Sequence, residues 1–152
     1  MNFEKAIVLI RNPLDASMAE FNRIFSNYDQ TGHSDVELFE LLNFSKLFQE
    51  ADLPQWMEFH ETILKDYKNK MHVVQYEKLK TNLIEEMKKI LGFLGYTMTK
   101  EIEFCLKSNF DGNFKRKERP EEEIYTILEN FTNSQLKYFD NVYKNYLKKF
   151  QI

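Results

Sequence analysis

The stretch Ala6-Ile-Val-Leu-Ile-Arg-Asn-Pro-Leu-Asp15 decides how this chain is expected to fold. Its first five residues are all apolar, a pattern typical of a strand that is buried on both faces of a parallel sheet. Arg11 follows immediately, so we expect its guanidinium at the carboxyl end of that strand, where open α/β sheets bind their ligands. Asn12-Pro13 predicts a turn, because the residue before a proline avoids the α region.

This turn is expected to lead into a helix over residues 16–25, with either Asn12 or Asp15 as its N-cap. Arginine offers five N–H donors in a rigid fork, and a helix N-terminus beside it also attracts anions. The stretch therefore predicts an anion-binding site around Arg11. The alternative that the residues leave open is a structural salt bridge made by an arginine at a strand end.

The bulk composition is that of one globular domain of 152 residues, 43% of them hydrophobic and 15% aromatic. A formal net charge of −3 argues against general nucleic-acid binding, which needs a basic face. Cys105 is the only cysteine, so no disulfide can form within the chain. The apolar run before Arg11 is too short to span a membrane, and we recognise no membrane segment and no targeting signal.

A second strand is predicted over residues 71–76, which are β-branched at their centre. The capping pairs Ser34 with Glu37 and Thr132 with Gln135 indicate helix starts. Helices are predicted over residues 36–50, 54–70, 82–94, 99–107, 120–130 and 132–149. Strands that alternate with helices predict an α/β fold, with short parallel strands flanked by several helices.

Two further segments carry chemistry. Tyr76-Glu-Lys-Leu-Lys80 begins where the second strand ends, so Tyr76 can border a bound base, or it can simply pack on the next helix. Asp111-Gly-Asn-Phe-Lys-Arg-Lys-Glu-Arg119 holds four cations in its last five residues. Such a loop can close over a nucleotide's phosphates through charge-assisted hydrogen bonds, or it can be a solvated surface. Trp56 and His60 share a helix face and are expected to pack on each other.

These segments resemble those of sulfotransferases. Arg11-Asn-Pro-Leu-Asp15 is similar to the segment that holds the 3′-phosphate of the sulfate donor PAPS, and Tyr76-Glu-Lys-Leu-Lys80 is similar to a Tyr-Glu-Asp-Leu-Lys segment near the adenine. Ala19-Glu-Phe-Asn-Arg23 and Asp111-Gly-Asn-Phe-Lys-Arg116 resemble more particularly the WSC-domain-containing sulfotransferases, a Golgi family linked to sulfation of sialic acid.

The resemblance implies that Arg11 holds the 3′-phosphate, that Tyr76 borders the adenine, and that Lys115 and Arg116 close over the phosphates. Many sulfotransferases carry a second phosphate ligand, a serine eight residues after the arginine; here that position is an alanine, and Ser17 is the nearest hydroxyl. The implied co-substrate is PAPS (3′-phosphoadenylyl sulfate), with no metal. His33, His60 and His72 have no metal-site spacing, and no residue stands out as the catalytic base.

Glycine is scarce, and none of the four glycines follows a strand in a glycine-rich phosphate loop. The sulfotransferase fold resembles that of P-loop kinases, in which the first strand leads into such a loop. We therefore expect residues 1–152 to be a single partial sulfotransferase domain, the C-terminal part of a catalytic domain. A P-loop nucleotide kinase is disfavoured, because it would need a Gly-Lys-Ser/Thr loop.

The expected function is transfer of a sulfuryl group from PAPS to a hydroxyl of a glycan or glycoprotein, with a sialylated glycan as the acceptor. The resemblance implies that the parent protein is membrane-anchored in the Golgi. The alternative is a non-catalytic helical binding module or an inactive truncated paralogue. On its own, this chain is expected to be inactive.

Overall fold

The computed structural model describes residues 4–26, 32–67, 69–109 and 118–152. Two parallel strands, β1 (Ala6–Ile10) and β2 (Met71–Gln75), pair in a register that places Ala6 beside Met71 and Ile10 beside Gln75. The first strand has the predicted bounds, and the second is one residue shorter than predicted. Because the pairing is parallel and in register, both strands end at the same edge of the sheet.

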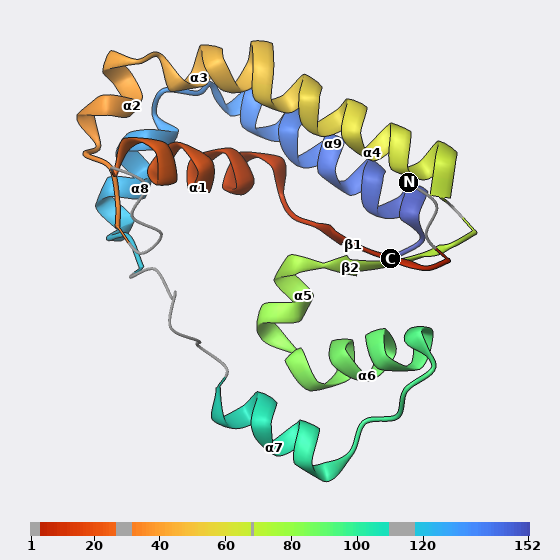
Figure 1. Ribbon diagram of the computed structural model, residues 1–152. Coiled ribbons are helices and arrows are strands. Elements are labelled where there is room, and N and C mark those ends of the chain that lie inside the picture. The colour runs from red at the N-terminus through yellow and green to blue at the C-terminus, as the bar shows by residue number, and fades with distance from the viewer. Residues whose placement is uncertain (1–3, 27–31, 68, 110–117) are drawn as a thin grey trace.

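Helices make up most of the described chain. They are α1 (Pro13–Phe25), α2 (Glu37–Leu41), α3 (Phe44–Leu47), α4 (Leu53–Tyr67), α5 (Tyr76–Thr81), α6 (Leu83–Leu94), α7 (Lys100–Ser108), α8 (Glu121–Leu128) and α9 (Asn133–Phe150), with a π-helical segment η1 (Phe48–Asp52) before α4. Figure 1 shows α1, α4 and α9 on one side of the small sheet and α5, α6 and α7 on the other. Within the described ranges, no helix is long and apolar enough to cross a bilayer.

The main core lies on the side of α1, α4 and α9 and is largely aromatic. Phe39, Phe44 and Phe48 are fully buried. The Phe48 ring meets the Phe139 ring edge-on at 4.8 Å between centroids, and the Phe44 ring meets Phe131 at 6.0 Å. These contacts fix the start of α9 against α3 and η1, and α9 then runs along α4 toward the sheet (Figure 1).

The expectation that β1 is buried on both faces is wrong. Val8 and Ile10 are buried, but Ile7 is 44% exposed and Leu9 is 50% exposed. On that face α6 lies against β2, where the His72 ring stacks on Phe93 at 5.5 Å between centroids. The covering helix therefore shields the β2 half of the face and leaves the β1 half open to solvent.

The single helix predicted over residues 36–50 is wrong too. Asn43 has a φ of 50°, and this left-handed conformation ends α2 before α3 begins. Ser34 does not cap a helix, because its N–H and its hydroxyl both donate to the Asn22 side-chain oxygen, at 3.1 and 2.9 Å. The capping box of Thr132 with Gln135 is confirmed at the start of α9.

Candidate anion-binding site at the strand ends

The structure brings Arg11 and Tyr76 together at the carboxyl ends of β1 and β2. The guanidinium carbon of Arg11 lies over the Tyr76 ring, 4.6 Å from its centroid, which is a cation–π contact. Among the described residues, the buried Nε of Arg11 has no hydrogen-bond partner. Buried donors are normally paired, so this nitrogen is free to receive an acceptor from outside the described residues; the buried Nε of Arg119 is likewise without a partner among them. Among the described residues Arg11 forms no ion pair, so the structural salt bridge considered as an alternative is not seen there.

The peptide unit between Arg11 and Asn12 is held from both sides. The Trp56 indole N–H on α4 donates to the Arg11 carbonyl at 3.2 Å. The Asn12 N–H donates to the Glu77 carboxylate on α5 at 3.0 Å. Tyr143 on α9 donates its hydroxyl to the other Glu77 oxygen at 2.5 Å. Side chains from three helices thus fix the backbone from which the Arg11 side chain extends.

Asn12 also begins α1. Its side-chain oxygen accepts hydrogen bonds from the N–H groups of Leu14, at 3.0 Å, and of Asp15, at 3.4 Å. Of the two N-caps considered from the sequence, the structure therefore selects Asn12, and α1 begins at Pro13. This cap already satisfies the Leu14 and Asp15 N–H groups, so the guanidinium of Arg11 is the group that favours an anion here, aided only by the positive end of the α1 dipole.

The carboxylates near Arg11 differ in their tendency to ionise. Burial opposes ionisation of Glu77, but the hydrogen bonds from Asn12 and Tyr143 outweigh it and hold the Glu77 pKa below its ordinary value. Burial, together with the hydrogen bond to Glu77, raises the pKa of Tyr143, which keeps the phenol protonated as a donor. Desolvation raises the pKa of Asp15 although the residue reaches solvent, and the Arg11 charge works in the opposite direction.

The other predicted phosphate ligands are not brought to Arg11 in the described structure. Ser17 is buried, and its hydroxyl donates to the Asp52 carboxylate on η1, so it already has a partner within the protein. Lys115 and Arg116 lie outside the described residues. The roles predicted for these three residues stay predictions.

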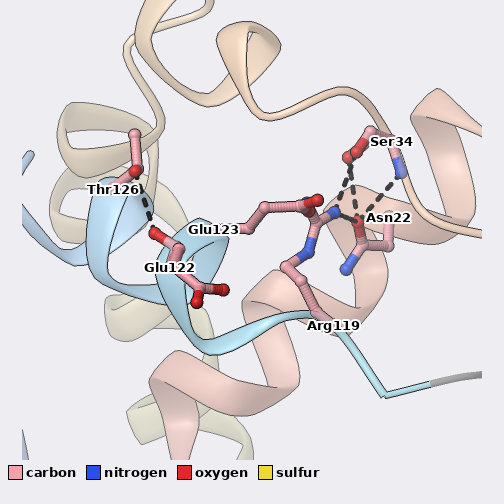
Figure 2. A network of polar contacts seen from close by, with 6 residues as sticks. All are labelled: Asn22, Ser34, Arg119, Glu122, Glu123 and Thr126. Atoms are coloured by element: carbon pink, nitrogen blue, oxygen red, sulfur yellow. Dashed lines mark hydrogen bonds and ion pairs between the residues drawn. The ribbon is translucent and has the colours of Figure 1, made fainter.

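Arg119 is not part of a free basic cluster, contrary to the sequence-based expectation. Its side chain is 5% exposed and forms an ion pair with Glu123 at 2.6 Å. Its guanidinium also donates to the Asn22 side chain and to the Ser34 carbonyl, both at 2.8 Å. Figure 2 shows this network, in which Arg119 reaches from the start of α8 to α1. Arg119 therefore holds these helices together through its two terminal nitrogens, and its buried Nε has no partner among the described residues.

Sequence reasoning missed three residues of the site. Trp56 was expected only to pack on His60, and the two rings do stack at 4.0 Å between centroids, yet its indole also reaches the Arg11 carbonyl. Glu77 stands next to Tyr76 in the same segment, but the sequence pattern predicts no role for it. Tyr143 lies within the helix predicted over residues 132–149, and nothing in that prediction gives it a polar role. In the part of the chain that is described, no group of His, Cys, Asp and Glu side chains could hold a metal ion.

Comparison with known proteins identifies the family of the chain. The family described as the sulfotransferase domain matches residues 2–151. The chain therefore belongs to the sulfotransferase domain family, and its α/β fold with parallel strands is that of this family. No solved structure matches the chain.

The curated relatives include members of the WSCD family. The chain is 27% identical over 117 residues to a WSCD family member of Drosophila melanogaster and 26% identical over 117 residues to one of Aedes aegypti. A third, from Drosophila pseudoobscura pseudoobscura, is 27% identical. Each match covers 77% of this chain and 37% of the relative, so the chain matches little more than a third of the length of these proteins. The resemblance to the WSC-domain branch is confirmed.

Proposed function

We propose that Arg11 and Tyr76 form the site for the 3′-phosphate and adenine end of PAPS. The observation that carries this proposal is the Arg11 guanidinium, which stacks on Tyr76 at the strand ends and keeps a buried Nε without a partner among the described residues. A phosphate oxygen is the acceptor that such a nitrogen lacks. Ser17, Lys115 and Arg116 are proposed as further ligands on the strength of the family resemblance.

The proposed reaction is transfer of the sulfuryl group of PAPS to a hydroxyl of a glycan or glycoprotein, with PAP as the leaving group. PAPS supplies the activated sulfuryl group, and the part of this chain is to hold the nucleotide by its 3′-phosphate. Fixed cations there orient the donor and bind the product, and preorganised charge of this kind contributes strongly to group transfer. No metal is proposed for this reaction.

The acceptor proposed is a sialylated glycan, and the location proposed for the parent protein is the Golgi membrane. Both rest on the resemblance to the WSC-domain branch of the family. A second candidate, an inactive paralogue or non-catalytic binding module, is favoured by one observation: the 152 printed residues contain no glycine-rich phosphate loop. The chain as printed is accordingly proposed to bind PAP but to transfer no labelled sulfate from PAPS.

The test measures nucleotide binding through the fluorescence of Trp56, which is the only tryptophan in the sequence. Its indole bonds to the Arg11 carbonyl, so a ligand on Arg11 should change its emission. We expect PAP to bind at least about tenfold more tightly than 5′-AMP, because only PAP carries the 3′-phosphate and losing such a charged contact costs about 2 kcal/mol or more. Arg11→Ala should abolish the difference.

Arg23→Ala is the matched control. Arg23 lies on α1, where it forms an ion pair with Glu20 at 2.5 Å, and its side chain is 41% exposed. This variant should keep the preference for PAP over 5′-AMP. Equal affinity of the wild-type chain for PAP and 5′-AMP would overturn the proposed 3′-phosphate site.

A further inference from the structure

We propose that Glu77 and Tyr143 are positioning residues for the Arg11 anion site. They hold the peptide unit that joins Arg11 to Asn12 and thereby fix the point from which the guanidinium extends. The inference rests on the proposed function, since it assumes that Arg11 binds the 3′-phosphate. It adds Glu77, Tyr143 and the helix α9 to the parts of the protein that determine the affinity for that phosphate.

The first step of the argument is the geometry of one peptide unit. Its carbonyl, which belongs to Arg11, accepts from Trp56 at 3.2 Å, and its N–H, which belongs to Asn12, donates to Glu77 at 3.0 Å. The peptide unit is planar, so hydrogen bonds to its carbonyl and to its N–H together restrict its rotation about the neighbouring φ and ψ bonds. The backbone on the carboxyl side of Arg11 is therefore fixed without any contact to the guanidinium itself.

The second step concerns the strength of the Glu77 contact. The carboxylate accepts from the Asn12 N–H with one oxygen and from the Tyr143 hydroxyl with the other. Hydrogen bonds to an ionised group are roughly twice as strong as neutral ones. Because those bonds hold the Glu77 pKa below its ordinary value, the carboxylate is charged at neutral pH and both bonds are of the strong kind.

The third step is what the Asn12 backbone controls. Asn12 is the N-cap of α1, so a displacement of this residue moves both the end of β1 and the first turn of the helix. The N–H groups of the first turn are satisfied by the Asn12 cap, so Arg11 is the group that binds the anion. Without Glu77 the Asn12 N–H loses its acceptor, and the backbone that carries Arg11 is no longer held in one arrangement.

The fourth step links the site to the last helix. Tyr143 is buried on α9, and its ring also meets the Trp56 ring edge-on, at 6.3 Å between centroids. Both side chains that grip the peptide unit are thus in contact with Tyr143, one through a hydrogen bond and one through packing. Removing the Tyr143 hydroxyl leaves the packing in place and isolates the polar contribution.

The experiment measures the 3′-phosphate preference, defined as the Kd for 5′-AMP divided by the Kd for PAP. Glu77→Ala should lower this ratio about fivefold or more, because even a small misplacement of a group that positions a ligand can cost large factors. Glu77→Gln should give an intermediate ratio, because the amide oxygen can still accept from Asn12 but that bond is no longer charge-assisted. Tyr143→Phe should lower the ratio by a smaller factor and also serves if Glu77→Ala fails to fold.

Tyr146→Phe is the matched control, because Tyr146 lies one turn further along α9 and also donates its hydroxyl to a glutamate, Glu61, at 2.9 Å. It should leave the ratio unchanged. A merely structural role predicts that Glu77→Ala weakens both nucleotides equally, and an unchanged ratio in Glu77→Ala and Tyr143→Phe would overturn the inference alone. A wild-type ratio near one would instead overturn the proposed function.

Discussion

The Arg11 guanidinium lies over the Tyr76 ring, 4.6 Å from its centroid, at the point where β1 and β2 end side by side. An aromatic face attracts a cation through its quadrupole but accepts no conventional hydrogen bond. The ring therefore holds the guanidinium without using up its N–H groups. This leaves the donors of Arg11 for an anion.

Tyr76→Leu should weaken PAP binding by about three- to tenfold, because a cation–π contact contributes roughly 0.5 to 2 kcal/mol depending on its burial. Tyr76→Phe should stay close to the wild type, since it keeps the aromatic face. Isothermal titration calorimetry with PAP measures both. If Tyr76→Leu bound PAP as tightly as the wild type, the ring would have no role in holding Arg11.

Arg119→Met should lower the free energy of unfolding by about 1 to 3 kcal/mol, the usual cost of leaving buried polar groups without a partner. The loss comes mainly from the Ser34 carbonyl, because the Asn22 side-chain oxygen still accepts from the Ser34 N–H and hydroxyl when Arg119 is removed. The ion pair with Glu123 adds little, because that carboxylate is 42% exposed. Arg119→Lys should also be destabilised, because an ammonium group cannot reproduce the forked geometry.

Urea unfolding followed by circular dichroism measures the effect of Arg119→Met and Arg119→Lys. Arg23→Met is the control on α1, because this arginine is half-buried and forms an ion pair with the exposed Glu20, and it should change the unfolding midpoint less than the Arg119 variants do. An unchanged midpoint in both Arg119 variants would show that the network in Figure 2 does not stabilise the fold.

His60 should make the fold less stable as the pH falls below about 6.5, the ordinary pKa of histidine. The side chain is buried. Its Nδ1 lies 2.6 Å from the Trp56 carbonyl oxygen, so this nitrogen carries the proton of the neutral ring. Its Nε2 has no partner among the described residues. Burial lowers its pKa, partly offset by that hydrogen bond. The unfolded chain therefore takes up a proton at a higher pH than the folded chain does.

The stability from neutral His60 is thus present above the unfolded pKa and is lost as the pH falls toward the lower folded pKa. The measurement is urea unfolding at a series of pH values between about 7 and 5 for the wild type and for His60→Phe. Other titrating groups are shared by the two proteins and cancel in the difference. His60→Phe should lose less stability over this range, and an identical slope would contradict the assignment.

The elements around Arg11 could be predicted because their signals are local. Five apolar residues followed by Arg11 and Asn-Pro predict a strand and a turn within ten positions, and the second strand follows from its β-branched centre. The anion at the strand end stays a prediction. The segment over residues 36–50 could not be predicted, because one left-handed residue, Asn43, divides it. Nothing in the apolar spacing distinguishes that residue from a helical asparagine.

The hydrogen bonds that hold the Arg11–Asn12 peptide unit could not be predicted for a different reason. Glu77 and Tyr143 lie 66 positions apart, and their contact depends on how α9 crosses the sheet. Arg119 illustrates the same limit, since a basic residue beside other cations is expected to be solvated unless its distant partners are known. Its partners Asn22 and Ser34 lie 97 and 85 positions away.

Ile7 and Leu9 should promote aggregation of this 152-residue chain. Both side chains are about half-exposed on the face of β1 that α6 does not cover, and an exposed apolar strand is a template for association. Threonine is β-branched and favours strands, so replacing both residues by threonine should keep the strand while removing apolar surface. The double variant should stay monomeric at concentrations at which the wild type associates, as measured by light scattering, with its unfolding midpoint nearly unchanged.

Val8→Thr is the control on the same strand, because Val8 is 6% exposed and faces the main core. A hydroxyl buried there without a partner should cost about 1 to 3 kcal/mol, so this variant should be destabilised and associate no less than the wild type. Equal aggregation of the wild type and the Ile7→Thr, Leu9→Thr double variant would show that this face is not where the chains associate. If Val8→Thr proved as harmless as the double variant, the assignment of the two faces of β1 would itself be wrong.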